Sequence, residues 1–439
     1  MKRKFYRVLE NWRHQNNAKP LMVIGVRQVG KTYLLTQYCR EYFNDYVYFN
    51  LMKQERVRDI FESKMSFEDK IKELSLESQH RILPGKTVIF LDEIQESDQA
   101  IISLKYFDEM LPKYRVLCAG SLLGVKLRNF NKSFPVGKVD IYQMYPLDFE
   151  EFLWALDHSM WSEEIHRCFV ANQKCVVHDK LMRLYHEYLL VGGMPEAVND
   201  FIAADKDIMA FNNHFSQSLI QQYLSDMNKF VTSKAESVWI ESVYQAIPSM
   251  LASELKRFQY RQVKAGAGKR ELYSAVDWLA SSNLIYQCFL VNNVKRPLKF
   301  FRQNNIFKLY LSDTGLLSTL VEVPIQDIML DRDFLAKGAL AENYVAQHLV
   351  ANGVPLHYWK SNNTAEIDFL LTWGDEIVPV EVKASSNKQS KSLRVYREKY
   401  QPRYSIRVSA RNFGLENGVK AVPLYAAFML KNHDAFPGE

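Results

Sequence analysis

The 439-residue sequence predicts an α/β fold built on a parallel sheet, with additional domains after it. Continuous apolar runs at residues 21–24 and 88–91 are typical of parallel strands, which are buried on both faces. Segments with helical spacing alternate with these runs, as they do in a sheet that helices cover on both sides. A chain of this length is expected to form two to four domains, because single cores stop growing near ~250–300 residues.

A glycine-rich loop follows the first apolar run and has the pattern Gly-x-x-x-x-Gly-Lys-Thr at residues 25–32. Gly25 and Gly30 let the backbone turn so that consecutive N–H groups face phosphate oxygens. Lys31 supplies a point charge for the β- and γ-phosphates, and the Thr32 hydroxyl is a ligand for Mg²⁺. We therefore expect a P-loop NTPase core with ATP and Mg²⁺ as cofactors. The nucleotide contacts are expected at Gly25, Val26, Arg27, Gln28, Val29, Gly30, Lys31, Thr32 and Tyr33.

Two further strands end in polar residues that suit nucleotide hydrolysis. The run at residues 88–91 leads to Asp92 and Glu93, at the carboxyl end of a parallel strand, where open sheets bind ligands. Asp92 would hold Mg²⁺ mostly through water, and Glu93 is placed to polarise the attacking water. The strand at residues 114–119 is followed by Gly120 and Ser121. Ser121 is expected to contact the γ-phosphate or the water, and a simple Gly-Ser turn is the alternative.

In combination, segments along nearly the whole chain resemble a family of bacterial and archaeal AAA-type ATPases with a C-terminal domain of unknown function. Besides the phosphate loop, the segments are Leu-Asp-Glu-Ile-Gln at 91–95, Ala-Gly-Ser-Leu-Leu at 119–123, Pro-Leu-Asp-Phe-Glu-Glu-Phe at 146–152, Val-Gly-Gly-Met-Pro-Glu at 191–196, Leu-Ser-Asp-Thr-Gly-Leu-Leu at 311–317, Glu-Ile-Asp-Phe-Leu at 366–370 and Pro-Val-Glu-Val-Lys at 379–383. The resemblance implies an AAA/RecA-like sheet and a homo-oligomer with nucleotide at the subunit interfaces.

In such interfaces a neighbour's cation completes the nucleotide site. Family members often have Gly-Arg where this chain has Gly137 and Lys138, so the resemblance does not fix which residue is that cation. Arg115 and Arg128 are alternatives to Lys138, and the sequence does not choose among the three.

The middle of the chain changes character twice. Residues 154–230 have helical spacing, with an apolar stripe that leads to Gly192-Gly193, and we expect a helical lid over the nucleotide. From about residue 236, helical spans precede an apolar strand at residues 284–291 and a lysine-rich strand. Helices followed by a short hairpin predict a winged-helix module.

The net charge of +6 is concentrated in this middle region. Residues 251–310 hold eleven Lys/Arg against three acids, so the remainder of the chain sums to −2. Such a segment is either an ordinary solvated surface or a nucleic-acid footprint. We expect DNA contacts, with subunit contact alone as the alternative. The candidate DNA-binding residues are Lys269, Arg270, Lys295 and Arg296.

The last hundred residues indicate a second chemistry. Asp368 and Glu381 fall on two adjacent predicted strands, and Lys383 shares the face of Glu381 because side chains alternate along a strand. With Glu342 on a preceding helix, this pattern is that of a PD-(D/E)XK restriction-endonuclease-like domain. The three carboxylates would hold Mg²⁺, while Lys383 and the metal activate water and stabilise the scissile phosphate. The alternative is a retained fold whose charged residues merely face water. The tail at residues 404–430 is expected to add a strand and a helix to this domain.

We therefore expect a cytoplasmic, ATP-hydrolysing protein that acts on DNA and has no membrane partner. No apolar run approaches the roughly 18 residues of a membrane span, and the five scattered cysteines indicate buried thiols in a reducing compartment. The predicted parts are an ATPase core at 1–155, a helical lid at 156–232, a winged-helix-like domain at 233–328 and a nuclease-like domain at 329–439. The rival hypothesis is a regulatory scaffold in which ATP sets the assembly state and the C-terminal domain only binds a partner.

Overall fold

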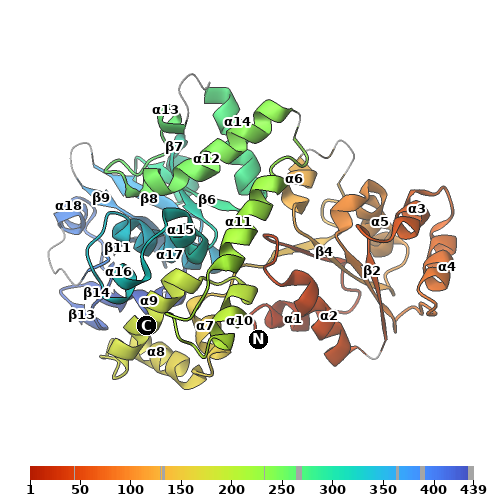
Figure 1. Cartoon of the computed structure of the whole chain (residues 1–439), viewed down its shortest axis with the longest axis horizontal. Coiled ribbons are helices and arrows are strands. Elements are labelled where there is room, and N and C mark those ends of the chain that lie inside the picture. The colour runs from red at the N-terminus through yellow and green to blue at the C-terminus, as the bar shows by residue number, and fades with distance from the viewer. Residues whose placement is uncertain are drawn as a thin grey trace. The chain divides into compact units, whose positions relative to one another are not determined.

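A computed structural model of the chain shows two compact units (Figure 1). The N-terminal unit comprises residues 3–145 and 281–283, and the C-terminal unit comprises residues 1–2, 146–280 and 284–439. No helix among the described residues has both the length and the apolar character required to span a membrane. The structure describes residues 1–43, 45–128, 130, 134–231, 233–263, 269–361, 365–385 and 391–433.

The N-terminal unit is built on a five-stranded parallel sheet with the order β2-β3-β4-β1-β5, which confirms the predicted α/β class. The strands are β1 (Leu21–Ile24), β2 (Tyr46–Asn50), β3 (Val88–Asp92), β4 (Arg115–Gly120) and β5 (Asp140–Gln143). Strand β3 is buried along its whole length, as its apolar run indicated. Strand β5 was not predicted, because it lies at the sheet edge and its two apolar residues, Ile141 and Tyr142, are exposed.

Helices flank this sheet, and the first of them packs apolar side chains into the core. Its residues Leu9 and Trp12 are buried, and Arg115 donates to the carbonyl oxygens of Trp12 and Gln15 at 3.1 and 2.9 Å. These bonds attach the end of the helix to the amino end of β4. The helices of the unit are α1 (Tyr6–His14), α2 (Lys31–Tyr42), α3 (Glu55–Glu62), α4 (Phe67–Glu77), α5 (Asp98–Glu109) and α6 (Leu123–Arg128), with the 3₁₀ helix η1 (Ile94–Glu96).

The C-terminal unit contains many α-helices, which lie before and between its strands in the sequence. The helices are α7 (Phe149–Ala155), α8 (Ser159–Ala171), α9 (His178–Val191), α10 (Pro195–Ala203), α11 (His214–Asp226), α12 (Lys234–Ala252), α13 (Tyr260–Val263), α14 (Lys269–Ser281), α15 (Thr314–Val321), α16 (Ile325–Met329), α17 (Lys337–Ala351) and α18 (Lys391–Tyr400). The segment that was predicted as a lid contains α8 to α11 and is helical as expected, and α12 to α14 precede the first hairpin.

Two sheets organise this unit. The four-stranded sheet has the order β7-β6-β8-β9, and β6 pairs with β8 in parallel, so one sheet includes strands from both sides of residue 328. The five-stranded sheet has the order β10-β11-β12-β14-β13. The strands are β6 (Ile285–Val291), β7 (Arg302–Leu311), β8 (His357–Lys360), β9 (Glu366–Ile367), β10 (Phe369–Trp373), β11 (Glu376–Val382), β12 (Ser405–Ser409), β13 (Gly414–Glu416) and β14 (Val419–Pro423).

The tail at residues 404–430 differs from the expected strand and helix, because it forms three strands and a 3₁₀ helix, η3 (Leu424–Met429). Strands β13 and β14 are joined by Asn417 and Gly418, whose φ angles are 51° and 73°. An Asn-Gly pair favours a two-residue hairpin turn because both residues tolerate positive φ. This local signal was available in the sequence.

Two of the glycine-containing segments meet by direct backbone contact. A Cβ on Gly315 would lie 2.6 Å from the Gly192 nitrogen, so neither position has room for a side chain. Asp313 links the segments further, because its carboxylate accepts from Gly193 N at 2.6 Å and from Leu316 N at 3.0 Å. The segments at 191–196 and 311–317 therefore form one buried junction inside the C-terminal unit.

Candidate functional sites

The loop between β1 and α2 has the geometry of a phosphate cradle. Gly25 and Gly30 have φ angles of 151° and 93°, and a Cβ on Gly25 would meet the Met144 carbonyl oxygen at 2.4 Å. The Lys31 side chain is buried, and its Nζ donates to the carbonyl oxygens of Gly25 and Val26 at 2.9 and 2.8 Å. Burial lowers the pKa of Lys31 to about 8. The lysine is thus held inside the loop, at the start of α2, where helix amides also favour an anion.

Thr32 and Asp92, the predicted magnesium ligands, are in contact. The Thr32 hydroxyl lies 3.1 and 3.0 Å from the two carboxylate oxygens of Asp92, and Tyr48 donates to the same carboxylate at 2.8 Å. Burial raises the pKa of Asp92, so a nearby cation would stabilise its charged form. A hydroxyl and a carboxylate are hard oxygen donors that suit Mg²⁺. The residues present therefore fit the expected cofactor.

The strand order brings a second group of polar side chains together. Strand β4 lies between β1, which leads into the phosphate loop, and β3, which ends at Asp92. Ser121 follows β4 and is therefore next to the ends of both strands. Its Oγ lies 3.4 Å from Glu93 Oε2, and Gln95 donates to the same oxygen at 2.5 Å. Glu93 itself has a φ of 51°. Gln95 was not predicted as a site residue, although its place two residues after Glu93 was visible in the sequence.

The three candidates for a trans-acting cation have different surroundings in the N-terminal unit. Lys138 lies 3.2 Å from the carboxylates of both Asp108 and Glu109. Arg115 donates to backbone oxygens of the first helix, as described above. Arg128 is exposed at the end of α6. The geometry of these three residues does not select the cation.

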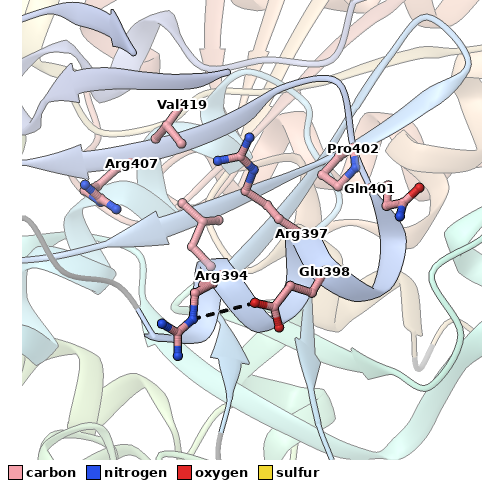
Figure 2. A pocket seen from close by; sticks show the side chains of 8 residues that line it. Arg394, Arg397, Glu398, Gln401, Pro402, Arg407 and Val419 are labelled. Carbon is pink, nitrogen blue, oxygen red and sulfur yellow. Dashed lines mark ion pairs between the residues drawn. The ribbon is translucent and has the colours of Figure 1, made fainter. Parts of the chain in front are cut away.

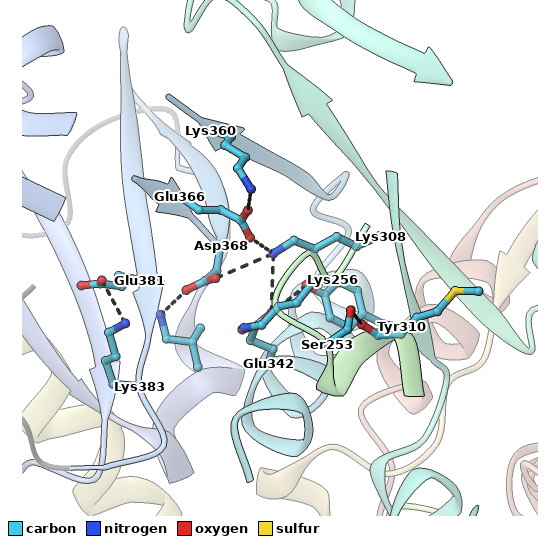
Figure 3. A network of polar contacts seen from close by, with 12 residues as sticks. Ser253, Lys256, Lys308, Tyr310, Glu342, Lys360, Glu366, Asp368, Glu381 and Lys383 are labelled. Carbon is cyan, nitrogen blue, oxygen red and sulfur yellow. Dashed lines mark hydrogen bonds and ion pairs between the residues drawn. The ribbon is translucent and has the colours of Figure 1, made fainter. Parts of the chain in front are cut away.

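The predicted C-terminal metal site contains two lysines that sequence reasoning missed (Figure 3). Lys308 is fully buried on β7, and its Nζ lies 2.5 Å from Glu366 Oε1, 3.6 Å from Glu342 Oε2 and 3.8 Å from Asp368 Oδ1. Lys256 forms an ion pair with Glu342 from the segment after α12. We call Lys256, Lys308, Glu342, Glu366 and Asp368 the lysine–carboxylate cluster.

The charges of this cluster are partly balanced within the protein, because two lysines face three carboxylates. Burial raises the pKa of Glu342, but the positive charges of Lys256 and Lys308 outweigh burial and lower this pKa to about 2. Burial and the neighbouring Glu342 raise the pKa of Asp368 to about 7. Two ammonium groups therefore occupy the position at which a metal ion was expected to neutralise the carboxylates.

Glu381 and Lys383 lie apart from the cluster in Figure 3. Lys383 Nζ is 3.3 Å from Glu381 Oε1, which agrees with the shared face predicted from their spacing, and Arg407 Nε is 4.0 Å from Glu381 Oε2. Asp368 instead accepts a hydrogen bond from Val382 N at 2.8 Å. Within the described part of the chain, the donor atoms of Glu342, Asp368 and Glu381 do not all lie within 4.8 Å of one another.

One other group of metal-type side chains does converge among the described residues, namely Glu164, Cys168 and Cys175. Arg167 already pairs with Glu164 through two hydrogen bonds of 2.8 Å. Burial raises the pKa of Cys168 to about 12, so its thiol stays protonated at neutral pH. A protonated thiol is a poor metal ligand. All five cysteines are buried and free, as their scattered positions predicted.

The candidate DNA-binding residues belong to two different segments of the structure. Arg270 is exposed on α14, whereas Lys295 and Arg296 are exposed after β6, where they line a cavity of about 350 Å³. Arg296 donates to Asp375 at 2.9 Å, so its charge is partly balanced. The side chain of Lys269 lies outside the described residues.

Comparison with family models divides the chain into three segments. Residues 17–153 match a model described as an AAA domain. Residues 182–327 and 337–427 match models described as domains of unknown function, DUF8612 and DUF4143. No curated protein matches the chain. The first segment is therefore an AAA-type nucleotide-binding ATPase domain, as its motifs predicted.

Three solved structures are similar to the chain at low scores. The Aeropyrum pernix ORC2 protein in its ADPNP–ADP complexes is 12% identical to this chain, with a TM-score of 0.33. The match covers 74% of this chain and 91% of the ORC2 chain. Cdc6p from Pyrobaculum aerophilum has 14% identity, coverages of 74% and 92%, and a TM-score of 0.25. The S. cerevisiae Hsp104–ADP complex has 14% identity, coverages of 64% and 37%, and a TM-score of 0.27. These scores are too low to support an inference about this chain.

Proposed function

We propose that this protein is a Mg²⁺-dependent ATPase whose hydrolysis cycle acts on DNA. The observation that supports the ATPase most directly is the meeting of Lys31, Thr32, Asp92, Glu93 and Ser121 at one edge of the parallel sheet. These residues come from the ends of two neighbouring strands, β3 and β4, and from the start of α2. Nucleotide chemistry needs this combination of a phosphate cradle, hard oxygen ligands and a carboxylate.

Each residue would have a separate role in the reaction. Lys31 would exchange its bonds to the Gly25 and Val26 carbonyls for bonds to phosphate oxygens. Thr32 and Asp92 would hold Mg²⁺, which supplies charge neutralisation of the β- and γ-phosphates when bound. Glu93 would orient the attacking water and accept its proton, because Gln95 and Ser121 hold one carboxylate oxygen and leave the other available.

Glu93→Gln tests this assignment, with Glu96→Gln as a matched control on an exposed residue of the same turn. We expect Glu93→Gln to bind ATP normally and to hydrolyse it at least ~100-fold more slowly, because the metal site is kept and the proton acceptor is removed. Glu96→Gln should behave like the wild type. Hydrolysis at the wild-type rate by Glu93→Gln would assign the base to another residue.

The DNA part of the proposal rests on the basic residues of the C-terminal unit. Duplex or single-stranded DNA should raise the steady-state ATPase rate of the purified full chain in Mg²⁺. A rate that is independent of every DNA form would instead support the regulatory scaffold, in which nucleotide sets assembly and the C-terminal domain binds a partner.

The lysine–carboxylate cluster supports the scaffold over metal-dependent cleavage for the C-terminal domain. Lys256 and Lys308 balance part of the charge of its carboxylates, and Glu381 lies elsewhere. The test is calorimetric titration of Mn²⁺ into the Asp92→Asn full chain, which removes the metal ligand of the ATPase site, with and without Asp368→Asn, beside a DNA nicking assay. If the domain is a nuclease, Mn²⁺ binding and DNA nicking are both detected, and both disappear when Asp368→Asn is added. If the domain is a scaffold, neither Mn²⁺ binding nor nicking is detected with or without Asp368→Asn.

A further inference from the structure

A cavity of about 470 Å³ lies along α18 in the C-terminal unit and is lined by three arginines (Figure 2). Arg394 and Arg397 come from α18, and Arg407 comes from β12. We call the surface formed by these three residues the basic groove. Glu398 is the acidic residue that also lines it, so the groove carries a net positive charge.

The sequence around the groove is strongly basic. Residues 391–407 contain six Lys/Arg and one acid, which is a higher density of positive charge than in the segment 251–310 singled out above. A dense cluster of one sign on a short helix and strand repels itself unless an anion is near. This part of the surface is therefore prepared for a negatively charged ligand.

The arginines keep hydrogen-bond donors available. Arg397 donates to the Asn417 carbonyl at 2.6 Å, which uses one of the five donors of its guanidinium. Arg394 lies 3.8 Å from Glu398, and both side chains are largely exposed, at 73% and 69%. Arg407 is mostly buried, and its Nε lies 4.0 Å from Glu381 Oε2, beyond hydrogen-bond distance, and has no hydrogen-bond partner among the described residues. A buried donor without an acceptor is destabilising unless a ligand supplies one.

The groove adjoins the cavity that Lys295 and Arg296 line, because Gln401 and Pro402 contribute to both. Cations are thus distributed over two neighbouring hollows around the end of α18. A single small anion would use converging donors at one point. A chain of evenly spaced phosphates uses cations along a path, and guanidinium groups bind phosphate oxygens bidentately.

We propose that the basic groove, with the adjoining hollow at Lys295 and Arg296, holds the phosphodiester backbone of a nucleic acid. This inference rests on the proposed DNA-directed function and specifies where the backbone lies. Arg407 on β12 is paired in register with Glu381 on β11, so a phosphate bound at Arg407 lies next to the Glu381–Lys383 pair.

The test is fluorescence anisotropy on the full chain with a labelled DNA duplex, a single-stranded DNA and an RNA duplex over a series of NaCl concentrations. The test variant is Arg394→Ala/Arg397→Ala. The matched control is Arg183→Ala/Arg332→Ala, two exposed arginines of the same unit that also pair with acids. Removing one phosphate-binding cation reduces the log–log salt slope on duplex DNA by about 0.9, so the slope should fall by about 1.8 in the test variant and stay unchanged in the control. Thermal melting checks that both variants are folded.

The outcomes separate this inference from the proposed function. If the test variant keeps the wild-type affinity and slope on every probe that the wild type binds, the groove inference is wrong and the DNA-directed function stands. If the wild type binds RNA alone and the test variant does not, the groove is supported and the DNA function is wrong. If the wild type binds none of the three probes, both are overturned, while ATP hydrolysis is unaffected.

Discussion

Lys31 is a charged residue in an environment that disfavours its charge. Its pKa is lowered to about 8 by burial, and phosphate oxygens would favour the protonated form. The folded-state pKa lies below the ordinary value for lysine, so the free protein loses this proton as the pH rises through about 8. ATP binding above that pH must therefore take a proton back, and the affinity should fall by up to ~10-fold per pH unit.

Calorimetry in buffers with different ionisation enthalpies measures this proton uptake directly. We expect uptake between pH 8 and 9 for the wild type. Lys31→Arg should bind ATP without it, because a guanidinium stays protonated throughout this range. An absence of proton uptake by the wild type at pH 9 would show that Lys31 is fully charged before ATP binds.

Lys308 is the residue on which the lysine–carboxylate cluster depends most. Its ammonium lies within 4 Å of three carboxylates. Its replacement by Met would leave Asp368 without a lysine in contact and would leave Glu342 and Glu366 with one lysine each. We expect Lys308→Met to lower the free energy of unfolding by about 3–5 kcal/mol. Lys360→Met is the control, because Lys360 lies 3.3 Å from the same Glu366 but is 39% exposed and should cost less than ~1 kcal/mol. Urea unfolding of the two variants should therefore separate them clearly, and similar midpoints would contradict the role assigned to Lys308.

The junction between the segments at 191–196 and 311–317 shows how elements pack when glycines meet. Gly315→Ala should lower the free energy of unfolding by about 1–3 kcal/mol, because its Cβ would lie 2.6 Å from Gly192 N. Gly338→Ala on α17 is the control, since a Cβ there meets nothing within 4 Å. In a helix this change should stabilise the protein by up to about 1 kcal/mol. Thermal melting gives the sign of both effects, and a neutral Gly315→Ala would mean that the junction can open.

Elements with a strong local signal could be predicted from the sequence. The central strands were visible as apolar runs, and the phosphate loop carries its own geometry in its glycines. Strand β5 lacks such a run because it is an exposed edge strand. The ion pairs of Lys256 and Lys308 could not be predicted, because they join residues far apart in the sequence. Lys308 was still recognisable in the sequence as a single charged residue among the apolar residues of β7, which indicates a buried ion pair.

At the scale of the whole molecule, the AAA-type domain predicts assembly through nucleotide. A site completed by a neighbour's cation requires head-to-tail contacts, which generate closed rings when the rotation permits. Light scattering should show a larger assembly with a non-hydrolysable ATP analogue than without nucleotide. A strict monomer at every protein concentration, with full ATPase activity, would contradict this prediction.

The four-stranded sheet also predicts which fragments of the C-terminal unit can fold. A fragment of residues 329–439 would expose the edge of β8 that pairs with β6, and it would lack Lys308. Unpaired strand edges promote aggregation. We expect this fragment to be insoluble or unfolded, whereas residues 146–439 should give a folded fragment by circular dichroism. A soluble, cooperatively melting 329–439 fragment would show that the shared sheet is dispensable.

The pairing of β6 with β8 has a consequence for how such a chain could change over generations. Recombination that exchanges one gene segment for another preserves function only where few interactions cross the break. A crossover near residue 328 would place β6 from one parent beside β8 from another and Lys308 opposite foreign acids. The segments at 182–327 and 337–427 are therefore expected to be inherited together, as a single heritable block.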